Sequence, residues 1–539
     1  MQMHYATLWE ALVDRIGDRD AVVHAGVRRT WSEYEGRAAR LSSALAEAGL
    51  GRDSKFGLYL YNGIEYLESQ FAGMKLRSVP INVNYRYLDD ELLYLLDNSD
   101  SEALVFHKSL GDRVARVMER APKVKLWIEV DDGEGESVPG AVAYESLIDA
   151  HAPAKPTNRS ADDLYMLYTG GTTGMPKGVM YDIGGMMQGL MGAAFPILGL
   201  GLPQIDEVPD LVEKLHEEGG GPSAIPACPL MHGTGMWLGA LIPHLVGAKV
   251  VTLASRSFDA HELWQTVQAE AVSQVVIVGD AFAKPMLRAL DEAKARGDAY
   301  DVSSIRFLMS SGVMWTSEVK KQLLDWHDFL LIDAMGSTEG TMGTQITTRG
   351  NIGETARFAM SPNTKVFSED DREIVPGSGE SGMVAAGGSV PRGYYKDEAK
   401  SKATFRTING VRYSFPGDWA IVEADGSLTL LGRGSNCINT AGEKVYPEEV
   451  EEAVKLHPDV VDCLVVGVED EKFGQRVTAV ASLRAGSETD GEAIRESLRG
   501  KIAAFKLPKQ VFLVEKVERA PNGKADYVWA REVVEKALA

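Results

Sequence analysis

Short apolar runs rich in β-branched residues alternate with amphipathic segments through most of the chain. Residues 56–61 and 103–106 are runs of the first kind, and residues 8–16 and 38–48 have the apolar spacing of helices. The alternation continues with apolar runs at residues 249–253, 274–278, 306–309 and 329–332. Strands that alternate with helices form parallel sheets covered by helices, so the pattern predicts an α/β protein.

The texture of the sequence changes at about residue 366, where short strand-like runs and turns predict a small β-rich subdomain. The residues after Arg433 combine a helical pattern at 447–456 with strand-like runs at 463–468 and 478–483, which predicts a compact α+β unit. A chain of 539 residues is also too long for one hydrophobic core, so two or three domains are expected. The acidic stretch 205–222 is expected to be an inserted surface segment or lid.

The charge and the cysteines narrow the class of protein. A net charge of −21 and a pI near 5.0 argue against a nucleic-acid partner or an anionic membrane surface, which basic surfaces attract. Three scattered cysteines, Cys228, Cys437 and Cys463, form neither a disulfide framework nor a metal motif, which fits a reducing cytoplasm. Neither a secretory signal nor a membrane span is predicted.

The most specific chemistry lies in Tyr168-Thr-Gly-Gly-Thr-Thr-Gly-Met-Pro-Lys-Gly-Val179. Glycines let backbone N–H groups turn towards a bound anion, threonines add hydroxyl groups, and lysine adds positive charge. The segment differs from a Walker loop because Met175 and Pro176 separate Gly174 from Lys177. Glycine-rich segments alone are more often ordinary surface turns. The candidate phosphate-binding residues are Thr169, Gly170, Gly171, Thr172, Thr173, Gly174 and Lys177.

Further polar segments follow in the order Pro229-Leu-Met-His-Gly-Thr-Gly235, Ser311-Gly-Val313, Met335-Gly-Ser-Thr-Glu-Gly340, Pro416-Gly-Asp-Trp419, Gly432-Arg433, Thr440-Ala-Gly-Glu-Lys-Val-Tyr-Pro-Glu-Glu-Val450 and Pro521-Asn-Gly-Lys524. Each is weak by itself, since a histidine beside glycines is usually structural and Gly-Asp usually marks a turn. A carboxylate and a hydroxyl at a strand end, Glu339 and Thr338, have the chemistry of a Mg²⁺ site. The carboxylate of Asp418 can accept hydrogen bonds from two neighbouring ribose hydroxyls.

Taken together and in this order, these segments resemble the signatures of the adenylate-forming superfamily, which contains acyl-CoA synthetases, non-ribosomal adenylation domains and luciferases. The resemblance runs from about residue 165 to residue 524. It implies a large N-terminal domain, 1–432, of helix-covered mixed sheets with a β-rich subdomain, a hinge at 433–436 that includes Ser435, and a small mobile α+β domain, 437–539. The sequence departs from the family at Gly170, Met335, Ser435, Asn436 and Ala441.

The resemblance also implies a role for each matched residue. Thr338 and Glu339 lie near the phosphates, and Glu339 and Thr172 hold Mg²⁺. Lys524, Glu339 and Thr172 are the catalytic residues, and Lys524 reaches the carboxylate and the α-phosphate. The nucleotide further contacts Ser311, Gly312, Gly336, Ser337, Asp418 and Arg433. The acyl pocket draws on His232, Gly235, Trp237 and Ser310. Coenzyme A meets Gly442, Glu443 and Lys444. Tyr394 and Tyr395 are expected to serve packing only.

The implied activity is ATP-dependent activation of a carboxylic acid to its acyl-adenylate, with pyrophosphate release, followed by transfer to coenzyme A. The expected cofactors are ATP, Mg²⁺ and coenzyme A, and the expected acid is fatty or bulky and apolar, as in fatty-acid and steroid-side-chain ligases. A carrier-protein phosphopantetheine or another acceptor is the alternative for the second step. A catalytically dead homologue and a metabolite-sensing ATPase are the other interpretations. The sequence leaves the oligomeric state open, a homodimer included.

Overall fold

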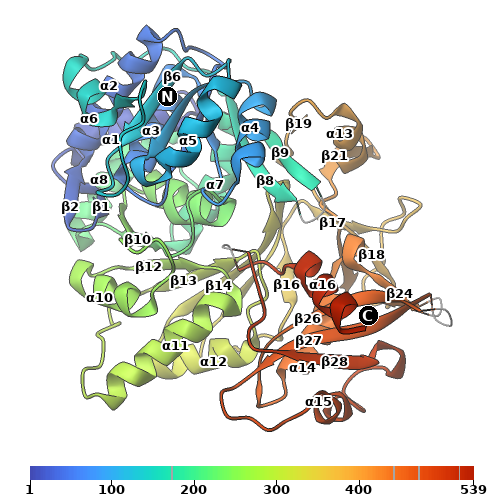
Figure 1. The fold of residues 1–539 in the computed structure, drawn as a ribbon. Helices are drawn as coiled ribbons and strands as arrows, with labels where there is room; N and C mark the ends of the chain where they lie inside the picture. The colour runs from blue at the N-terminus through green and yellow to red at the C-terminus, as the bar shows by residue number, and fades with distance from the viewer. Residues whose placement is uncertain (172–173, 441–442, 471–473, 521–522, 539) are drawn as a thin grey trace. The chain divides into compact units, whose positions relative to one another are not determined.

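A computed structural model describes residues 1–171, 174–440, 443–470, 474–520 and 523–538 of the chain (Figure 1). The chain forms two compact units, and each is made of several stretches of sequence. Unit 1 consists of Met1–Gly340, Ile346–Ile352 and Gly388–Arg406, and unit 2 of Thr341–Gln345, Gly353–Gly387 and Thr407–Ala539. The predicted hinge at residues 433–436 therefore lies inside unit 2, and its role as a hinge stays a prediction.

Unit 1 contains seven consecutive strands of a larger sheet, in the order β2-β1-β11-β10-β12-β13-β14. The bounds are Asp20–His24 for β1, Val27–Thr30 for β2, Ser223–Pro226 for β10, Lys249–Thr252 for β11, Gln274–Ile277 for β12, Phe307–Ser311 for β13 and Leu330–Ser337 for β14. All neighbours run parallel except β1 and β2. Because the strands are parallel, the ends of β13 and β14, where Ser311 and Ser337 lie, meet at one edge.

Helices α10 (Ala260–Glu270), α11 (Gly279–Ala295) and α12 (Ser317–Trp326) cover one face of this sheet, as Figure 1 shows. Their buried side chains share one apolar core with the strands, including Trp264 from α10, Met286 from α11 and Leu323 from α12. This arrangement confirms the α/β class predicted from the alternating runs.

A second parallel sheet of unit 1 has the order β4-β3-β5-β6-β7. Its strands are β3 (Lys55–Tyr59), β4 (Val79–Asn82), β5 (Ser101–His107), β6 (Leu126–Val130) and β7 (Val142–Ala143). The connecting helices are α3 (Ile64–Leu76), α4 (Asp89–Asn98) and α5 (Gly111–Val117), with α6 (Tyr144–Ala150) after β7. The expected runs at 56–61 and 103–106 thus form neighbouring buried strands.

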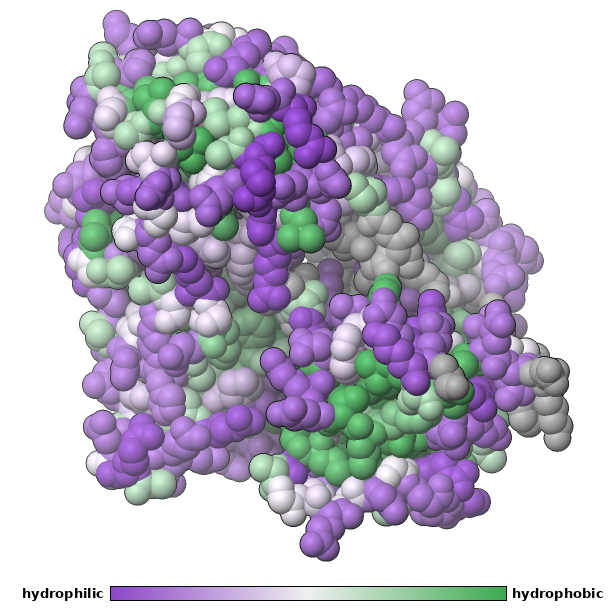
Figure 2. Space-filling view, viewed as in Figure 1, coloured by the Kyte–Doolittle hydropathy of each residue, from purple (hydrophilic) through white to green (hydrophobic). Residues whose placement is uncertain are grey.

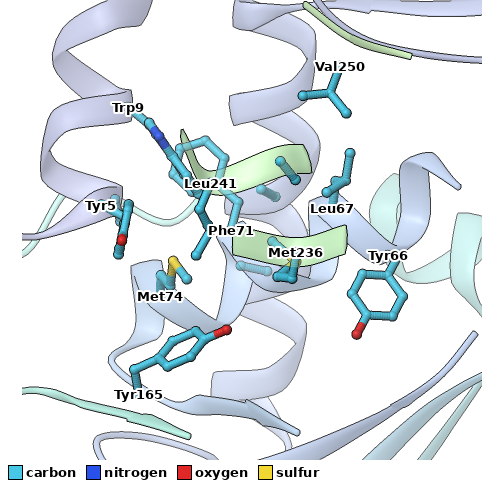
Figure 3. Close-up of a cluster of buried hydrophobic side chains, with 14 of the residues drawn as sticks. Tyr5, Trp9, Tyr66, Leu67, Phe71, Met74, Tyr165, Met236, Leu241 and Val250 are labelled. Carbon is cyan, nitrogen blue, oxygen red and sulfur yellow. The ribbon is translucent and has the colours of Figure 1, made fainter. Parts of the chain in front are cut away.

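A buried apolar cluster joins distant parts of unit 1 (Figure 3). Trp9 comes from α1 (Tyr5–Ile16), Phe71 from α3, Tyr165 from strand β8 (Leu164–Gly171), and Met236 from the segment that follows His232. The Trp9 and Phe71 rings meet edge to face with their centroids 4.9 Å apart. Helix α2 (Trp31–Glu47) packs into the same core through Trp31 and Tyr34. The cluster therefore fixes the strand that leads into the predicted phosphate segment.

The acidic stretch 205–222, which was expected to be an inserted surface segment or lid, forms a short turn and a helix. After the short turn η3 (Ile205–Glu207), helix α8 (Val208–Gly219) packs against α1. Val208 and Val212 are fully buried in the apolar core. The apolar residues Val208, Leu211, Val212 and Leu215 repeat at helical spacing, and the charges between them face outward. The expectation of a lid was wrong because the net charge hid this periodicity.

A three-stranded antiparallel sheet, β19-β9-β8, completes unit 1 around the predicted phosphate segment. Strands β8 (Leu164–Gly171) and β9 (Gly174–Asp182) form a hairpin, and β19 (Gly393–Tyr394) pairs with the outer side of β9. Helix α7 (Ile183–Ile197) follows β9, and helix α13 (Glu398–Thr404) follows β19.

Unit 2 contains an antiparallel sheet and an α+β part, as the change in texture predicted. The antiparallel strands are β16 (Arg357–Met360), β17 (Thr364–Phe367), β18 (Ser381–Ala386), β21 (Val411–Ser414), β22 (Asp418–Val422) and β23 (Ser427–Arg433). The α+β part has strands β24 (Ile438–Thr440), β25 (Glu443–Val445), β26 (Val460–Asp470), β27 (Gly474–Leu483) and β28 (Gln510–Val514), with helices α14 (Pro447–Lys455), α15 (Gly491–Ser497) and α16 (Tyr527–Leu538). Val450 and Val465 lie in its core.

The face of the molecule in Figure 2 carries mostly hydrophilic side chains. Among the described residues, no helix has both the length and the apolar character that crossing a membrane requires.

Candidate active site

The predicted phosphate segment is the hairpin β8–β9. Thr169 lies opposite Lys177 in its register, so each arm of the hairpin carries one of these two predicted ligands. The backbone of Gly170, Gly171 and Gly174 belongs to the two strands next to the tip. Thr172 and Thr173, which the sequence predicted as phosphate ligands, lie outside the described residues.

Asn82 anchors strand β8 of the hairpin at Tyr168. Its buried side-chain amide accepts a hydrogen bond from the Tyr168 N–H at 2.7 Å and donates to the Tyr168 carbonyl at 2.8 Å and the Met231 carbonyl at 2.7 Å. The same amide therefore ties the phosphate hairpin to the segment that precedes His232. Asn82 was not predicted from the sequence, although an asparagine at the end of an apolar strand is a visible polar exception.

Glu339 and Thr338 form the turn that follows β14. The Ser337 hydroxyl oxygen accepts the Glu339 N–H at 3.1 Å, and the Tyr181 hydroxyl donates to the Thr338 carbonyl at 2.8 Å. Burial raises the pKa of Tyr181, so its hydroxyl stays protonated and available as a donor. Since Tyr181 belongs to β9, this bond places the turn beside the hairpin.

Tyr394 connects the turn to Lys177. Its hydroxyl donates to the Glu339 carboxylate oxygen Oε1 at 2.7 Å, and the Lys177 Nζ lies 5.8 Å from the centroid of its ring. Lys177 itself pairs with the Asp397 carboxylate at 2.7 Å. The expectation that Tyr394 serves packing only is incomplete, because its hydroxyl bonds a predicted metal ligand. Only the fold reveals this, since β19 is far from both partners in sequence.

The predicted nucleotide residues Ser311 and Gly312 and the predicted acyl-pocket residue Ser310 lie at the end of the parallel strand β13. The Ser311 hydroxyl donates to the Ala334 carbonyl at 2.7 Å, and the Ser310 hydroxyl oxygen accepts the Gly279 N–H at 2.8 Å. These bonds connect β13 to its neighbours. Gly312 follows immediately after the strand and has a positive φ of 92°. Gly336 lies in β14 one residue before Ser337.

The predicted acyl-pocket residues Gly235 and Trp237 lie in a π-helix, η4 (Thr234–Leu241). The buried Gly235 is required there, because a β-carbon would overlap the Pro229 carbonyl oxygen. Half-buried Trp237 donates its indole N–H to the Tyr165 hydroxyl at 3.0 Å and meets the Tyr181 ring edge to face. His232 lies just before the π-helix and is partly exposed. π-Helical turns often occur at functional sites, which agrees with the predicted pocket.

In unit 2, Asp418 and Arg433 lie opposite each other on β22 and β23. The Arg433 Nε and the Asp418 Oδ1 are 3.5 Å apart, and the Asp418 side chain is 13% exposed. Glu448, from the first turn of α14, lies next to this pair, and burial raises the pKa of its carboxyl group. Gly432 has a positive φ of 127°, a conformation that favours glycine, and a β-carbon there would overlap the Glu448 carboxylate. Glu448 was not predicted from the sequence.

The remaining predicted residues also belong to unit 2. Ser435 lies in the short turn η5 (Gly434–Asn436) between β23 and β24. Glu443 lies on β25 and is exposed. Lys444 follows it on the same strand and lies opposite Asn439 in the backbone register of β24 and β25. Gly442 lies outside the described residues. Lys524 is exposed, and its carbonyl accepts the Ala520 N–H at 2.9 Å.

The residues of unit 1 fit a Mg²⁺ ion that is shared with phosphates. Within the described ranges, no three His, Cys, Asp or Glu side chains are arranged as metal ligands. Mg²⁺ usually takes one or two protein carboxylates and completes its shell with phosphate oxygens and water. The single carboxylate of Glu339, oriented by Tyr394 beside the hairpin, meets this requirement.

Comparison with known proteins agrees with the geometry. The AMP-binding enzyme family matches residues 9–395, and the AMP-binding enzyme C-terminal domain matches residues 449–524. The 3-oxocholest-4-en-26-oate–CoA ligase of Rhodococcus rhodochrous is 42% identical over 99% of this chain and 96% of its own. A medium/long-chain-fatty-acid–CoA/3-oxocholest-4-en-26-oate–CoA ligase of Mycolicibacterium smegmatis is 38% identical over 100% of this chain and 98% of its own.

Solved structures share the fold at lower sequence identity. The anthranilate CoA ligase in complex with anthranoyl-AMP has a TM-score of 0.85 at 19% identity and covers 99% of this chain and 98% of its own. The benzoate CoA ligase of Burkholderia xenovorans LB400 has a TM-score of 0.81 at 21% identity and covers 98% and 99%. The family match spans most of the chain, and the relatives match it from end to end. The chain belongs to the AMP-binding enzyme family, within the acyl-CoA synthetases of the adenylate-forming superfamily.

Proposed function

We propose that this protein uses ATP to convert a carboxylic acid into its acyl-adenylate and pyrophosphate, and then transfers the acyl group to coenzyme A. The observation that carries this proposal is the end-to-end match, at 42% identity, to a relative named as a CoA ligase. The phosphate hairpin, the Glu339 turn and the Asp418–Arg433 pair supply a chemical basis for the first step.

The acid is a medium- or long-chain fatty acid or a steroid side-chain acid. Relatives at 37–42% identity carry names of these substrate classes. Apolar surface at the candidate pocket supports this substrate class, because the π-helix η4 carries half-buried Trp237, which meets the Tyr181 ring edge to face. An apolar wall of this kind binds an alkyl or ring system through burial of apolar surface.

The hairpin binds the β- and γ-phosphates through the backbone N–H groups at its tip, the hydroxyls of Thr169, Thr172 and Thr173, and the charge of Lys177. Glu339, Thr338 and Thr172 hold the Mg²⁺, which neutralises phosphate charge. Attack of a carboxylate on the α-phosphorus brings two anions together, so positioning and charge neutralisation are the main tasks of the site. Ser311, Gly312, Gly336 and Ser337 are proposed to line the adenosine.

Asp418 accepts the ribose hydroxyls, and Arg433 assists beside it. Their pairing on adjacent strands supports this role, because the arginine orients the carboxylate before the nucleotide arrives. Lys524 is proposed to neutralise the carboxylate and the α-phosphate in the first step. Rotation of residues 437–539 about the hinge at 433–436 would then withdraw Lys524 and bring Gly442, Glu443 and Lys444 to coenzyme A.

Location and assembly are part of the proposal. A reducing cytoplasm is the proposed location, and the buried thiols of Cys228 and Cys463 suit it. A homodimer is the assembly we propose, and sedimentation of the purified protein tests it.

The test is pyrophosphate release with ATP and Mg²⁺ across a panel of fatty, steroid side-chain and aromatic acids, with and without coenzyme A. We expect acid-dependent pyrophosphate and AMP, with acyl-CoA formed only when coenzyme A is present. Lys524→Ala should lose acid-dependent pyrophosphate release but still convert supplied acyl-adenylate to acyl-CoA. Pyrophosphate release that never leads to an acyl-CoA would overturn the assignment of the acceptor. No release with any acid would overturn the proposed function.

A further inference from the structure

The Lys177–Asp397 pair brings together the lysine of the phosphate hairpin and a carboxylate from a distant part of the chain. The Nζ and Oδ2 atoms are 2.7 Å apart, and the two side chains are 37% and 31% exposed. Lys177 holds the pKa of Asp397 below its ordinary value, so the carboxylate is charged at neutral pH. A site built for triphosphate thus already contains one negative charge beside its lysine.

Asp397 is fixed in position by its neighbours. Its second oxygen, Oδ1, accepts the Lys400 N–H at 2.9 Å and caps α13. Its backbone carbonyl accepts the Ser401 hydroxyl at 2.7 Å. Because the carboxylate caps a helix, it cannot follow the lysine when the lysine moves.

The segment that carries Asp397, residues 393–397, is anchored on both of its sides. Tyr394 pairs with Val179 of the hairpin, and the Tyr395 N–H donates to the Gly178 carbonyl at 2.8 Å. On the opposite side, the Tyr395 hydroxyl donates to Asp100 at 2.7 Å and the Lys396 Nζ pairs with Asp100 at 2.8 Å. The brace segment, as we call residues 393–397, is therefore a rigid mount for the carboxylate.

Lysine is the mobile partner of the pair. It carries its charge on a flexible four-carbon stem, whereas a capping aspartate has little freedom. Two adjacent phosphates carry more negative charge than one carboxylate, so they attract the lysine more strongly when they enter the hairpin. Breaking the Lys177–Asp397 ion pair costs free energy, and this cost lowers the affinity of the hairpin for the phosphates.

We propose that Asp397 is a resident counter-ion that holds Lys177 until the phosphates of ATP displace it, and that it retakes the lysine when pyrophosphate leaves. Asp397 is thus a positioning residue that acts through Lys177. This inference rests on the proposed function, because it requires the hairpin to bind phosphates. Its consequence is that the enzyme gives up some affinity for ATP and gains faster release of pyrophosphate.

The deciding variant is Asp397→Asn, because asparagine also caps helices well but carries no charge. Equilibrium binding of MgATP and of AMP to the full chain is measured by calorimetry in the absence of the acid. We expect the dissociation constant for MgATP to fall about threefold or more, on the scale of a partly exposed ion pair, while that for AMP stays the same. Inhibition by pyrophosphate should strengthen by a similar factor.

Two controls separate the charge from other effects. Glu398→Gln removes a neighbouring charge that forms an ion pair with Lys402, at 4.0 Å, and should leave MgATP binding unchanged. In a Lys177→Met background, Asp397→Asn should lose most of its effect on MgATP binding. The carboxylate and the phosphates then have no lysine for which to compete. Equal melting temperatures of the wild-type chain and Asp397→Asn show that the cap is preserved.

The outcomes separate the two proposals. If the wild-type chain does not bind MgATP, the proposed function fails. If the wild-type chain binds MgATP but Asp397→Asn binds it equally or more weakly, the counter-ion proposal fails while the function stands. The counter-ion proposal also fails if AMP and MgATP gain affinity equally, or if the gain persists in the Lys177→Met background.

Discussion

At the scale of single residues, neighbouring tyrosines of the brace segment have different partners. The Tyr394 hydroxyl bonds Glu339, whereas the Tyr395 hydroxyl bonds Asp100. Tyr394→Phe removes one hydrogen bond to a charged carboxylate, which is worth about 1.5–3 kcal/mol. We therefore expect about a tenfold higher Mg²⁺ requirement for pyrophosphate release, with activity restored by excess Mg²⁺.

Tyr395→Phe is the matched control, and its Mg²⁺ requirement should equal that of the wild-type chain. Binding of Mn²⁺ in the presence of ATP, followed by electron paramagnetic resonance, gives a readout that does not depend on turnover. An unchanged metal affinity in Tyr394→Phe, or an equal loss in both variants, would show that the Tyr394 hydroxyl does not orient Glu339.

Residues whose chemistry is visible locally were predictable from the sequence. Lys177 lies in a glycine- and threonine-rich segment, and Glu339 lies in a polar motif after an apolar strand. Tyr394, Asp397 and Asn82 were not predictable, because each acts on a partner more than fifty residues away in sequence. Their roles depend on strand pairing that local spacing does not encode.

At the scale of elements, a buried ion pair joins α12 to β14, the strand that leads into the Glu339 turn. Lys320 and Asp333 lie 2.9 Å apart with side chains 1% and 8% exposed. Burial raises the pKa of Asp333, and the charge of Lys320 opposes this shift. Lys320→Met should destabilise the chain by about 3–5 kcal/mol, because it leaves a buried carboxylate without its ion partner.

Thermal unfolding measures this effect, and the double variant Lys320→Met/Asp333→Leu should recover most of the loss. Lys402→Met, in an exposed pair, should change stability by less than about 1 kcal/mol. A double variant that is less stable than Lys320→Met alone would contradict this account.

Elements were predictable where one periodicity dominated. The apolar runs at 249–253 and 274–278 became β11 and β12 nearly as bounded. Helix α8 was not predicted, because the many acidic residues of this stretch indicated a surface segment. The helical spacing of Val208 and Val212 is the signal that could have predicted it. The phosphate segment was predictable from its residues, whereas its pairing with β19 was not, because β19 lies far along the chain from β9.

At the scale of the whole molecule, the mechanism that we propose for the two-step reaction includes a rotation about residues 433–436. Ser435→Pro should restrict this turn, because proline fixes its own φ and disfavours helical geometry at Gly434 before it. We expect the overall rate to fall at least about tenfold while one half-reaction persists, since one orientation is then disfavoured. Pyrophosphate exchange follows the first half-reaction, and thioester formation from supplied acyl-adenylate follows the second.

Ser435→Ala serves as the control and should retain both half-reactions. Equal loss of both half-reactions in Ser435→Pro, at an unchanged melting temperature, would argue against a hinge at this position. The sequence predicted the β-rich and α+β textures of unit 2, but it did not reveal that the chain crosses between the two units repeatedly.

The position of β19 has a consequence for the order in which the chain is made. On the ribosome, the hairpin β8–β9 emerges long before residues 393–397, which supply its third strand and the partners of Lys177 and Glu339. A nascent or prematurely terminated chain would carry the whole signature loop and still lack the strand that braces it. The third strand of this sheet, the counter-ion of Lys177 and the hydroxyl that bonds Glu339 are therefore acquired late in synthesis, so a fragment that ends before residue 393 carries the motif without all three.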